Sequence, residues 1–248
     1  MALLTACTTA SSSPATSQGP ATSAGASPGF PAAYQTDAPY QPVIDPASFV
    51  SGVDNPYWSL KPGSKWRYEG DIDGTPEVVT VEVLAETKEI LGITCVVVRD
   101  EVTADGKTIE LTFDWYAQDV DGNVWYFGED SKEYENGAVV GTTGSWEAGV
   151  DGAQPGIVMP ADPGQVSGTY RQEYYAGEAE DLARVLETGA SVITRFGSFD
   201  DVLVTEEWTP LEPETREHKS YARDIGFVKE EVVQGGSGSV ELVSYEPG

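Results

Sequence analysis

The sequence predicts an all-β protein, either an antiparallel β-barrel or half-barrel or a β-sandwich, with at most one short helix. Runs of alternating apolar and polar residues follow one another from about residue 57, and turn signals separate them at close intervals. The stretch 113–129 predicts a hairpin with apolar side chains on both faces, which therefore needs cover on both sides. The strand pattern of about 57–130 also returns loosely at 165–232, which predicts two degenerate four-stranded repeats.

The first half is organised around the dipeptide Asp121-Gly122, which readily takes the positive φ angles of a tight hairpin turn. Similar turn signals precede it at Pro62-Gly63, Asp73-Gly74 and Asp105-Gly106. Strands are therefore expected from about residue 65, at 78–84, 94–102 and 108–118, and on the return arm after residue 122.

The second half is expected to repeat this order after a linker loop at 131–164. That loop is rich in Gly, Asp, Ala and Pro, but Trp146 and the apolar patch 157–159 should fold it over the barrel. Acidic residues and apolar spacing predict a helical turn at 178–182 that runs into a strand. Further strands are expected at 168–174, 183–188, 201–206, 221–230 and 239–245. Residues 51–248 should thus form a single domain.

The N-terminal fifty residues are expected to determine the location of the protein rather than to fold. Leu4-Thr5-Ala6-Cys7 resembles the lipobox of bacterial lipoproteins, whose cysteine receives the lipid. The resemblance implies a lipidated Cys7 and an extracytoplasmic protein that is lipid-anchored to the bacterial cell membrane. Residues 8–50 are dominated by Ser, Thr, Ala, Pro and Gly, so they are expected to form a disordered tether.

Residues 1–7 lack the charged start and the apolar stretch of about 7–15 residues that a signal peptide needs. We therefore expect a truncated signal peptide here. The alternative is a cytoplasmic protein with a chance match to the lipobox.

The charge balance excludes several classes of partner. The 248-residue chain has 14 Lys and Arg against 41 Asp and Glu, which gives a net charge of −27. Such a surface repels nucleic acid and anionic lipid headgroups, so we expect no nucleic-acid partner and membrane contact through a lipid anchor only. The same charge attracts cations, although solubility is a sufficient reason for it.

Two stretches of the core resemble a loosely defined and largely uncharacterised group of secreted bacterial β-barrel lipoproteins. The group opens with a strand of the type Pro-Leu-x-Pro-Gly-x-x-Trp-x-Tyr, which corresponds to 59–68 with Ser59 in place of the first proline. It closes with a hairpin of the type Tyr-x-x-x-x-Gly-x-Val-Lys, which corresponds to 221–229. The resemblance implies a β-barrel and an envelope location, and it implies no reaction.

Few residues are available for familiar chemistry. The chain has two cysteines, Cys7 and Cys95, and one histidine, His218, whereas most metal and acid–base sites use histidine. It has no Gly-x-Ser-x-Gly nucleophile motif, phosphate-binding loop or dinucleotide-binding fingerprint. We therefore expect no cofactor, with Ca²⁺ as the alternative.

The candidate Ca²⁺ ligands are Asp119, Asp121 and Asn123, because hard cations favour carboxylate and amide oxygens. Their spacing is not that of an EF-hand, since Asp130 stands where a bidentate Glu belongs. The same residue types are also what hairpin turns are made of, so a purely structural role is the competing interpretation.

The leading hypothesis is a non-enzymatic lipoprotein that binds a small ligand or an envelope partner. One alternative is a carbohydrate-active enzyme with paired carboxylates, for which Asp114 and Glu173 are the catalytic candidates. Another is a structural envelope protein. An apolar pocket would favour the binder, and a cleft with two facing carboxylates would favour the enzyme. The candidate ligand-binding residues are the aromatic residues Tyr116, Trp125, Tyr126, Trp146, Tyr174 and Tyr175.

Overall fold

The computed structural model describes residues 40–248. The lipobox with Cys7 and most of the expected tether lie outside the described residues. The described part contains two short 3₁₀ turns, η2 (Pro46–Ser48) and η3 (Pro163–Gln165), as its helical elements. Neither is long or apolar enough to cross a membrane.

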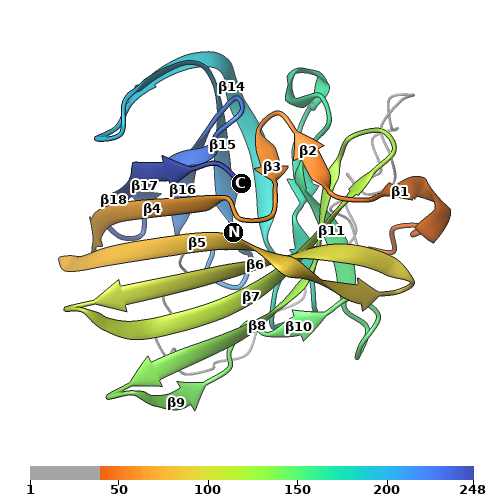
Figure 1. Ribbon diagram of the computed structural model, residues 1–248, viewed down its shortest axis with the longest axis horizontal. Coiled ribbons are helices and arrows are strands. Elements are labelled where there is room, and N and C mark those ends of the chain that lie inside the picture. Colours follow the sequence, from red (N-terminus) through yellow and green to blue (C-terminus); the bar gives the residue numbers. More distant parts are fainter. Residues whose placement is uncertain (1–39) are drawn as a thin grey trace, which may run out of the picture.

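The strands form one large antiparallel sheet that nearly closes into a barrel (Figure 1). Its order is β12-β14-β15-β16-β17-β18-β4-β5-β6-β7-β8-β11-β13. The strands at the two ends of this order, β12 and β13, are separated in sequence only by Gln172, so the edges of the sheet come together. The all-β prediction is confirmed, with a barrel-like form. The long strands are β4 (Lys65–Ile72), β5 (Thr75–Ile90), β6 (Ile93–Ala104), β7 (Lys107–Asp119), β8 (Val124–Glu135), β14 (Leu182–Ile193), β15 (Ser198–Trp208), β16 (Arg216–Ala222), β17 (Gly226–Gln234) and β18 (Gly238–Glu246).

Shorter strands extend the sheet, and a separate hairpin packs into its lumen. Strand β1 pairs with β7, and both β9 and β10 pair with β8. The separate β2–β3 hairpin inserts Trp58, whose ring centroid lies 5.6 Å from that of Tyr116 and 5.7 Å from that of Tyr221. The short strands are β1 (Phe49–Val50), β2 (Val53–Asn55), β3 (Trp58–Leu60), β9 (Ala138–Gly141), β10 (Trp146–Glu147), β11 (Gln154–Met159), β12 (Thr169–Arg171) and β13 (Glu173–Tyr174).

The two halves of the sheet have the same connectivity. Strands β4 to β8 form one meander, and β12 followed by β14 to β17 forms the other, in the order that the sequence similarity predicts. Strand β18 joins the halves, because it pairs with β17 on one side and with β4 on the other. Whether the halves are copies of one ancestral unit stays a prediction.

The central hairpin is the predicted one. Strands β7 and β8 flank the turn at Asp121-Gly122, where Gly122 has a φ of 97°. Trp115 and Tyr116 lie on opposite faces of β7, and both are buried. The prediction that this hairpin is covered on both sides is therefore confirmed.

Three segments differ from expectation. The segment 131–164, expected to be a linker loop, contains β9, β10 and β11, because the edge of β8 offers these short strands backbone partners. The expected helical turn at 178–182 is absent. Gly177, with a φ of 78°, closes a tight turn there, and Tyr175 forms a β-bridge with Ala179. The folded part also begins before residue 51.

Tyr40 explains that early start. Its side chain is buried, and its hydroxyl donates a 2.9 Å hydrogen bond to the carbonyl oxygen of Pro155. The Arg171 guanidinium lies 5.5 Å from the centre of the Tyr40 ring, which adds a cation–π contact. Composition alone predicts disorder up to residue 50, but Tyr40 at one end of the segment and Phe49 at the other, which packs against Trp125 and Phe127, attach it to the barrel.

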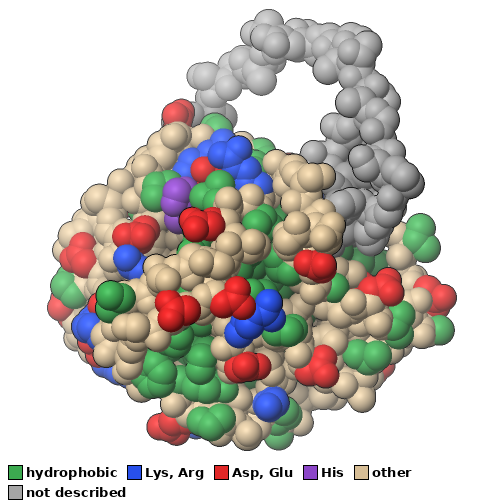
Figure 2. Space-filling view, turned by 90° about the horizontal axis from the view of Figure 1, so that it is seen from above, with side chains coloured by type: hydrophobic (Ala, Val, Ile, Leu, Met, Phe, Trp, Pro, Cys, Tyr) green, Lys and Arg blue, Asp and Glu red, His purple; other side chains and the backbone are tan. Residues whose placement is uncertain are grey.

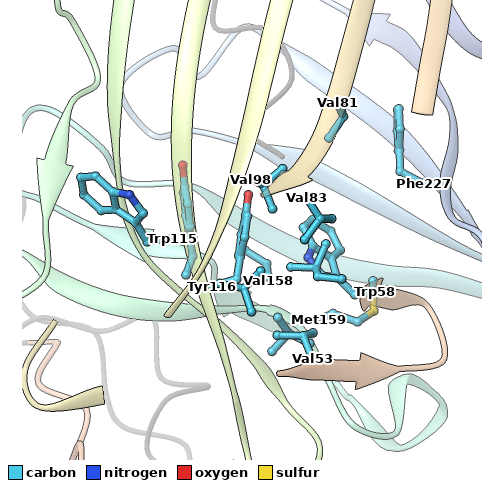
Figure 3. Close-up of a cluster of buried hydrophobic side chains, with 14 of the residues drawn as sticks. Val53, Trp58, Val81, Val83, Val98, Trp115, Tyr116, Val158, Met159 and Phe227 are labelled. Atoms are coloured by element: carbon cyan, nitrogen blue, oxygen red, sulfur yellow. The ribbon is translucent and has the colours of Figure 1, made fainter. Parts of the chain in front are cut away.

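The apolar part of the lumen is tightly filled. Trp58, Val81, Val98, Tyr116 and Phe227 converge there (Figure 3). The space that remains between such residues amounts to about 20 Å³, which is room for about one water molecule and too little for an organic ligand. This end of the barrel is a packed core.

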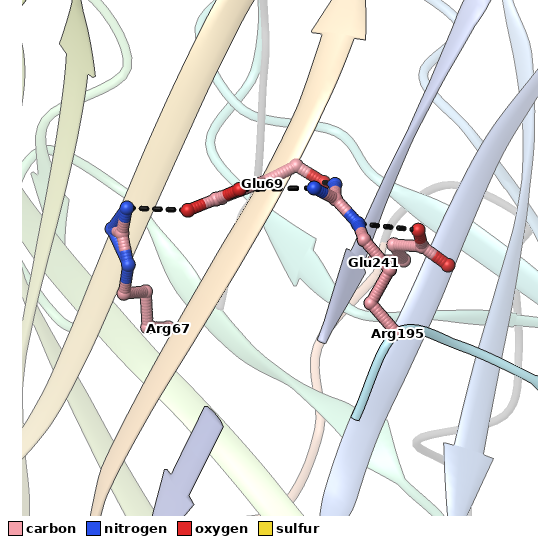
Figure 4. Close-up of polar contacts among 4 residues, drawn as sticks. All are labelled: Arg67, Glu69, Arg195 and Glu241. Carbon is pink, nitrogen blue, oxygen red and sulfur yellow. Dashed lines mark hydrogen bonds and ion pairs between the residues drawn. The ribbon is translucent and has the colours of Figure 1, made fainter. Parts of the chain in front are cut away.

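The β14–β15 hairpin forms a long arm whose tip is fixed to the other half of the barrel. Arg195, in the turn of the arm, lies 2.9 Å from a carboxylate oxygen of Glu69 on β4 and 2.7 Å from one of Glu241 on β18 (Figure 4). Arg67 adds a further ion pair with Glu69.

Elsewhere, acidic side chains are spread over the face seen in Figure 2 rather than gathered in one patch.

Candidate functional site

The lumen changes character along β7. Tyr116 belongs to the apolar end, whereas the next inward-facing positions are Asp114, Thr112 and Glu110. Strand β8 continues the polar surface, because its cross-strand partners are also polar. The three pairs are Asp114 with Glu129, Thr112 with Ser131, and Glu110 with Glu133. One wall of the barrel is therefore acidic at this end.

A cavity of about 230 Å³ opens between this wall and two loops. The first loop follows β13, which carries Glu173, and brings Glu178; the second follows β15 and brings Glu212. Seven of the fourteen lining residues are acidic, and none is Lys, Arg or His. The seven are Glu110, Glu129, Glu133, Glu173, Glu178, Asp181 and Glu212.

Glu173 is the most firmly positioned of these carboxylates. Strand β10 pairs Trp146 with Glu129, and the Trp146 indole Nε1 donates a 2.8 Å hydrogen bond to Oε2 of Glu173. The Glu173 side chain is only 6% exposed. Burial, reinforced by the nearby charge of Asp181, raises the pKa of Glu173 well above its usual range.

Asp114 and Asp100 lie deeper on the same inward face. Asp114 is 1% exposed, and its Oδ1 accepts a 2.6 Å hydrogen bond from the Tyr126 hydroxyl, but its Oδ2 accepts none from the described residues. Asp100 is 6% exposed, and neither of its carboxylate oxygens accepts a hydrogen bond from that part of the chain. Burial raises the pKa of both groups, and for Asp100 the charge of Asp114 raises it further.

Burial moves the pKa of several cavity carboxyls towards neutral pH. Burial raises the pKa of Glu110 to about 7 and that of Asp181 to about 6. It also raises the pKa of Glu129 well above its usual range, with the charge of Asp114 as the second cause. The site can therefore exchange protons for a positively charged ligand.

A buried ammonium group occupies the neighbouring part of the lumen. Lys219 on β16 is 6% exposed, and its Nζ lies 3.2 Å from Glu207, 3.5 Å from Glu217 and 3.6 Å from Glu230. Burial alone would lower the pKa of Lys219, but these carboxylates raise it well above its usual value. Its charge also reaches the cavity, since it lowers the otherwise raised pKa of Asp181.

The candidate calcium ligands form a turn of their own. Oδ1 of Asp119 accepts hydrogen bonds from the backbone amides of Asp121 and Asn123. Its Oδ2 accepts from Nδ2 of Asn123 and from Nε1 of Trp125, both at 2.8 Å. The described residues contain no group of three or more Asp, Glu, His or Cys placed to hold a metal ion. Calcium binding stays a prediction, and these contacts give Asp119 a structural role.

The candidate aromatic residues are divided between several places. Tyr126 and Trp146 adjoin the cavity through Asp114 and Glu173, whereas Tyr116 belongs to the apolar core. Tyr174 packs against Arg171, with 4.6 Å from the guanidinium carbon to the ring centre, and Tyr175 packs against the core. The cavity is thus acidic rather than apolar, unlike the pocket that the binding hypothesis called for.

Comparison with known proteins adds little to this description. No family model matches the sequence, and no curated protein matches it. One solved structure that is similar in fold is the crystal structure of a "putative lipoprotein" from Parabacteroides distasonis ATCC 8503. The two proteins are 13% identical, with a TM-score of 0.44, and the match covers 77% of this chain and 99% of the other. At these values the likeness carries no argument about function.

Proposed function

We propose that this protein is an extracytoplasmic, lipid-anchored binding protein that holds a small ligand in the acidic cavity without catalysing a reaction. The observation that carries the proposal is the cavity itself, with its seven acidic side chains, no basic one and about 230 Å³ of space. Closed, low-dielectric walls of one charge focus the field and concentrate ligands of the opposite charge. The apolar end of the barrel supports the same choice, because it is already filled.

A thermal-shift screen of the full chain tests the binding. The panel contains neutral sugars, organic cations, organic anions and divalent metal ions at matched ionic strength. A genuine ligand raises the melting temperature of the native protein by mass action, and Glu173→Gln should remove that shift. If no compound stabilises the protein, or if the shift survives Glu173→Gln, the cavity is not the binding site.

The anchoring part of the proposal concerns Cys7. With a complete signal peptide, the protein should partition into the detergent phase, and both Cys7→Ser and globomycin treatment should abolish this partition. Membrane association that persists under both conditions would exclude lipidation at this residue.

One observation favours carbohydrate hydrolysis as a second candidate function. Asp114 and Glu173 lie at the same end of the lumen, both with a raised pKa, and Trp146 stands beside them. Retaining and inverting glycosidases use two such carboxyl groups. A panel of aryl glycosides and polysaccharides should then give an activity that both Asp114→Asn and Glu173→Gln remove.

A further inference from the structure

We propose that the acidic cavity takes a short aliphatic polyamine, bound through its primary ammonium groups and exchanged for protons. This inference rests on the proposed function, since it names the class of ligand that the same cavity binds. It depends on three features: the charge of the lining, the carboxylate oxygens that lack a donor, and the way the barrel already holds Lys219.

The lining selects for charge. Its seven acidic side chains are accompanied by no basic side chain, so an anionic ligand would meet repulsion from every wall. A neutral ligand would supply no counter-charge to those carboxylates that are ionised, and a buried charge without one is costly at low dielectric. A cationic ligand removes both difficulties.

Three buried oxygens on the inward faces of β6 and β7 accept no hydrogen bond from the described residues. They are Oδ2 of Asp114 and both carboxylate oxygens of Asp100. Asp114 is the cross-strand partner of Glu129, which lines the cavity, and cross-strand partners project to the same face of a sheet. An ammonium group brings three N–H donors, so a single head can serve Asp114 and Glu129 together.

Lys219 shows how this lumen holds an ammonium group. Its Nζ lies within 3.6 Å of one oxygen from each of three carboxylates, those of Glu207, Glu217 and Glu230. The ammonium is a compact point charge with freely directed donors, unlike the planar guanidinium of arginine. The cavity that Asp181 helps to line presents carboxylates of the same kind. Its lining contains no lysine, arginine or histidine to pair with them.

Size separates a polyamine from other cations. The cavity, at about 230 Å³, is smaller than the roughly 300–1,000 Å³ of sites for drug-sized ligands, and a short unbranched diamine suits it. A bare divalent ion would need several carboxylates to converge on one point, and the described residues contain no such group of three.

Proton exchange follows from the same contacts. Glu110, whose pKa is about 7, and below about pH 6 also Asp181, must lose a proton to pair with an ammonium, because a carboxylic acid has no charge to offer. Binding should therefore release protons, and the affinity should rise by roughly tenfold per pH unit for each proton displaced. This increase ends above the pKa values of these carboxyl groups, about 7 for Glu110 and about 6 for Asp181, and the affinity falls where the ligand amines themselves deprotonate, near pH 10.

Isothermal titration of the full chain with putrescine, cadaverine and spermidine tests the proposal, with 1,4-butanediol as the neutral counterpart of putrescine. Titrations in phosphate and in Tris, which differ in ionisation enthalpy, count the protons released. We expect saturable binding of at least one amine, proton release, and no binding of the diol. Glu173→Gln should weaken amine binding by at least about tenfold. Glu212→Gln, on a loop, serves as a second cavity variant if Glu173→Gln does not fold.

The matched control is Glu82→Gln, which makes the same charge change on the outer surface, where Glu82 pairs with Lys65. It should leave the affinity within about twofold, since a single exposed charge contributes little. If Glu82→Gln weakens binding as much as Glu173→Gln, or if Mg²⁺ at equal ionic strength displaces the amine, the binding is a diffuse ion atmosphere and the inference is overturned. If a neutral compound binds in the cavity instead, the ammonium inference fails and the proposed function survives. If nothing in the panel binds, both fail.

Discussion

Lys219→Met should destabilise the barrel strongly, because it removes the cation that pairs with three largely buried carboxylates. The Lys219 side chain is 8% exposed, and those of Glu207, Glu217 and Glu230 are 8%, 15% and 0% exposed. Removing one partner of a buried ion pair costs about 3–5 kcal/mol, because the remaining charge stays buried and uncompensated. Methionine matches the lysine stem in length, so the loss should be mainly electrostatic. We expect a cost in that range at pH 8.

The cost should fall at lower pH. Burial already raises the pKa of Glu217 to about 7, and it raises the pKa of Glu230 well above its usual range. At pH 5.5 these carboxyls can take up protons and remove the uncompensated charge. One pKa unit on one carboxyl corresponds to about 1.4 kcal/mol, so the destabilisation should shrink by at least that amount. The lysine itself stays charged at both pH values, because its pKa is raised.

Urea unfolding followed by tryptophan fluorescence measures both free energies. The control is Lys65→Met, because Lys65 Nζ pairs with Glu82 at 2.9 Å on the surface, with the two side chains 46% and 31% exposed. Such a pair contributes at most about 1 kcal/mol. Adding Glu230→Gln to Lys219→Met should restore part of the loss. If Lys219→Met costs no more than Lys65→Met at pH 8, the reasoning from buried charge is wrong.

Four further outcomes follow from other contacts. Because burial raises the pKa of Glu110 to about 7 from 4.5, the native state holds a proton that the unfolded chain has lost. Stability should therefore fall as pH rises from about 4.5 to 7, by up to about 3 kcal/mol for such a group, and Glu110→Gln should flatten calorimetric melting curves against pH. Asp119→Ala should cost at least about 2 kcal/mol in urea unfolding, and CaCl₂ should stabilise the native protein no more than NaCl of equal ionic strength. Gly128→Ala should lower the melting temperature by several degrees, since a Cβ would lie 2.2 Å from the Trp146 carbonyl oxygen at a φ of 126°. Fragments 50–135 and 165–248, expressed separately, should show no sharp melting transition, because neither contains the whole barrel.

The strands were predictable because their signals are local. Asp121-Gly122 specifies a turn by its own conformational preference, and the alternating residues beside it identify β7 and β8. Strand β11 has no such signal. It contains Pro155 and Gly156, which usually interrupt strands, and a Cβ on Gly156 would lie 2.4 Å from the backbone of Gln172. Gly156 is required because the backbone of Gln172, which is distant in sequence, lies so close to it. The local sequence pattern does not reveal this contact.

The acidic cavity was not predictable, because β7 reverses the usual alternation. Its apolar residues Ile109, Leu111 and Phe113 alternate with Glu110 and with other polar side chains. A pattern-based assignment directs the apolar set into the core, but here the polar set faces the lumen and the apolar set is half-buried outside. The catalytic candidates Asp114 and Glu173 were singled out from sequence, whereas Lys219 was not, because a lysine in a charged strand normally faces solvent.

The pairing of β18 with β4 places a constraint on the order of folding. Eight residue pairs join these strands, and β18 follows every other strand in the chain. Until β18 emerges, the first meander presents the unpaired edge of β4, and such an edge invites pairing with other chains. Closing the contact spans nearly the whole described sequence, which makes it slow. The high net negative charge then also opposes aggregation during folding. Mutual repulsion keeps incompletely folded chains apart until the last strand has paired.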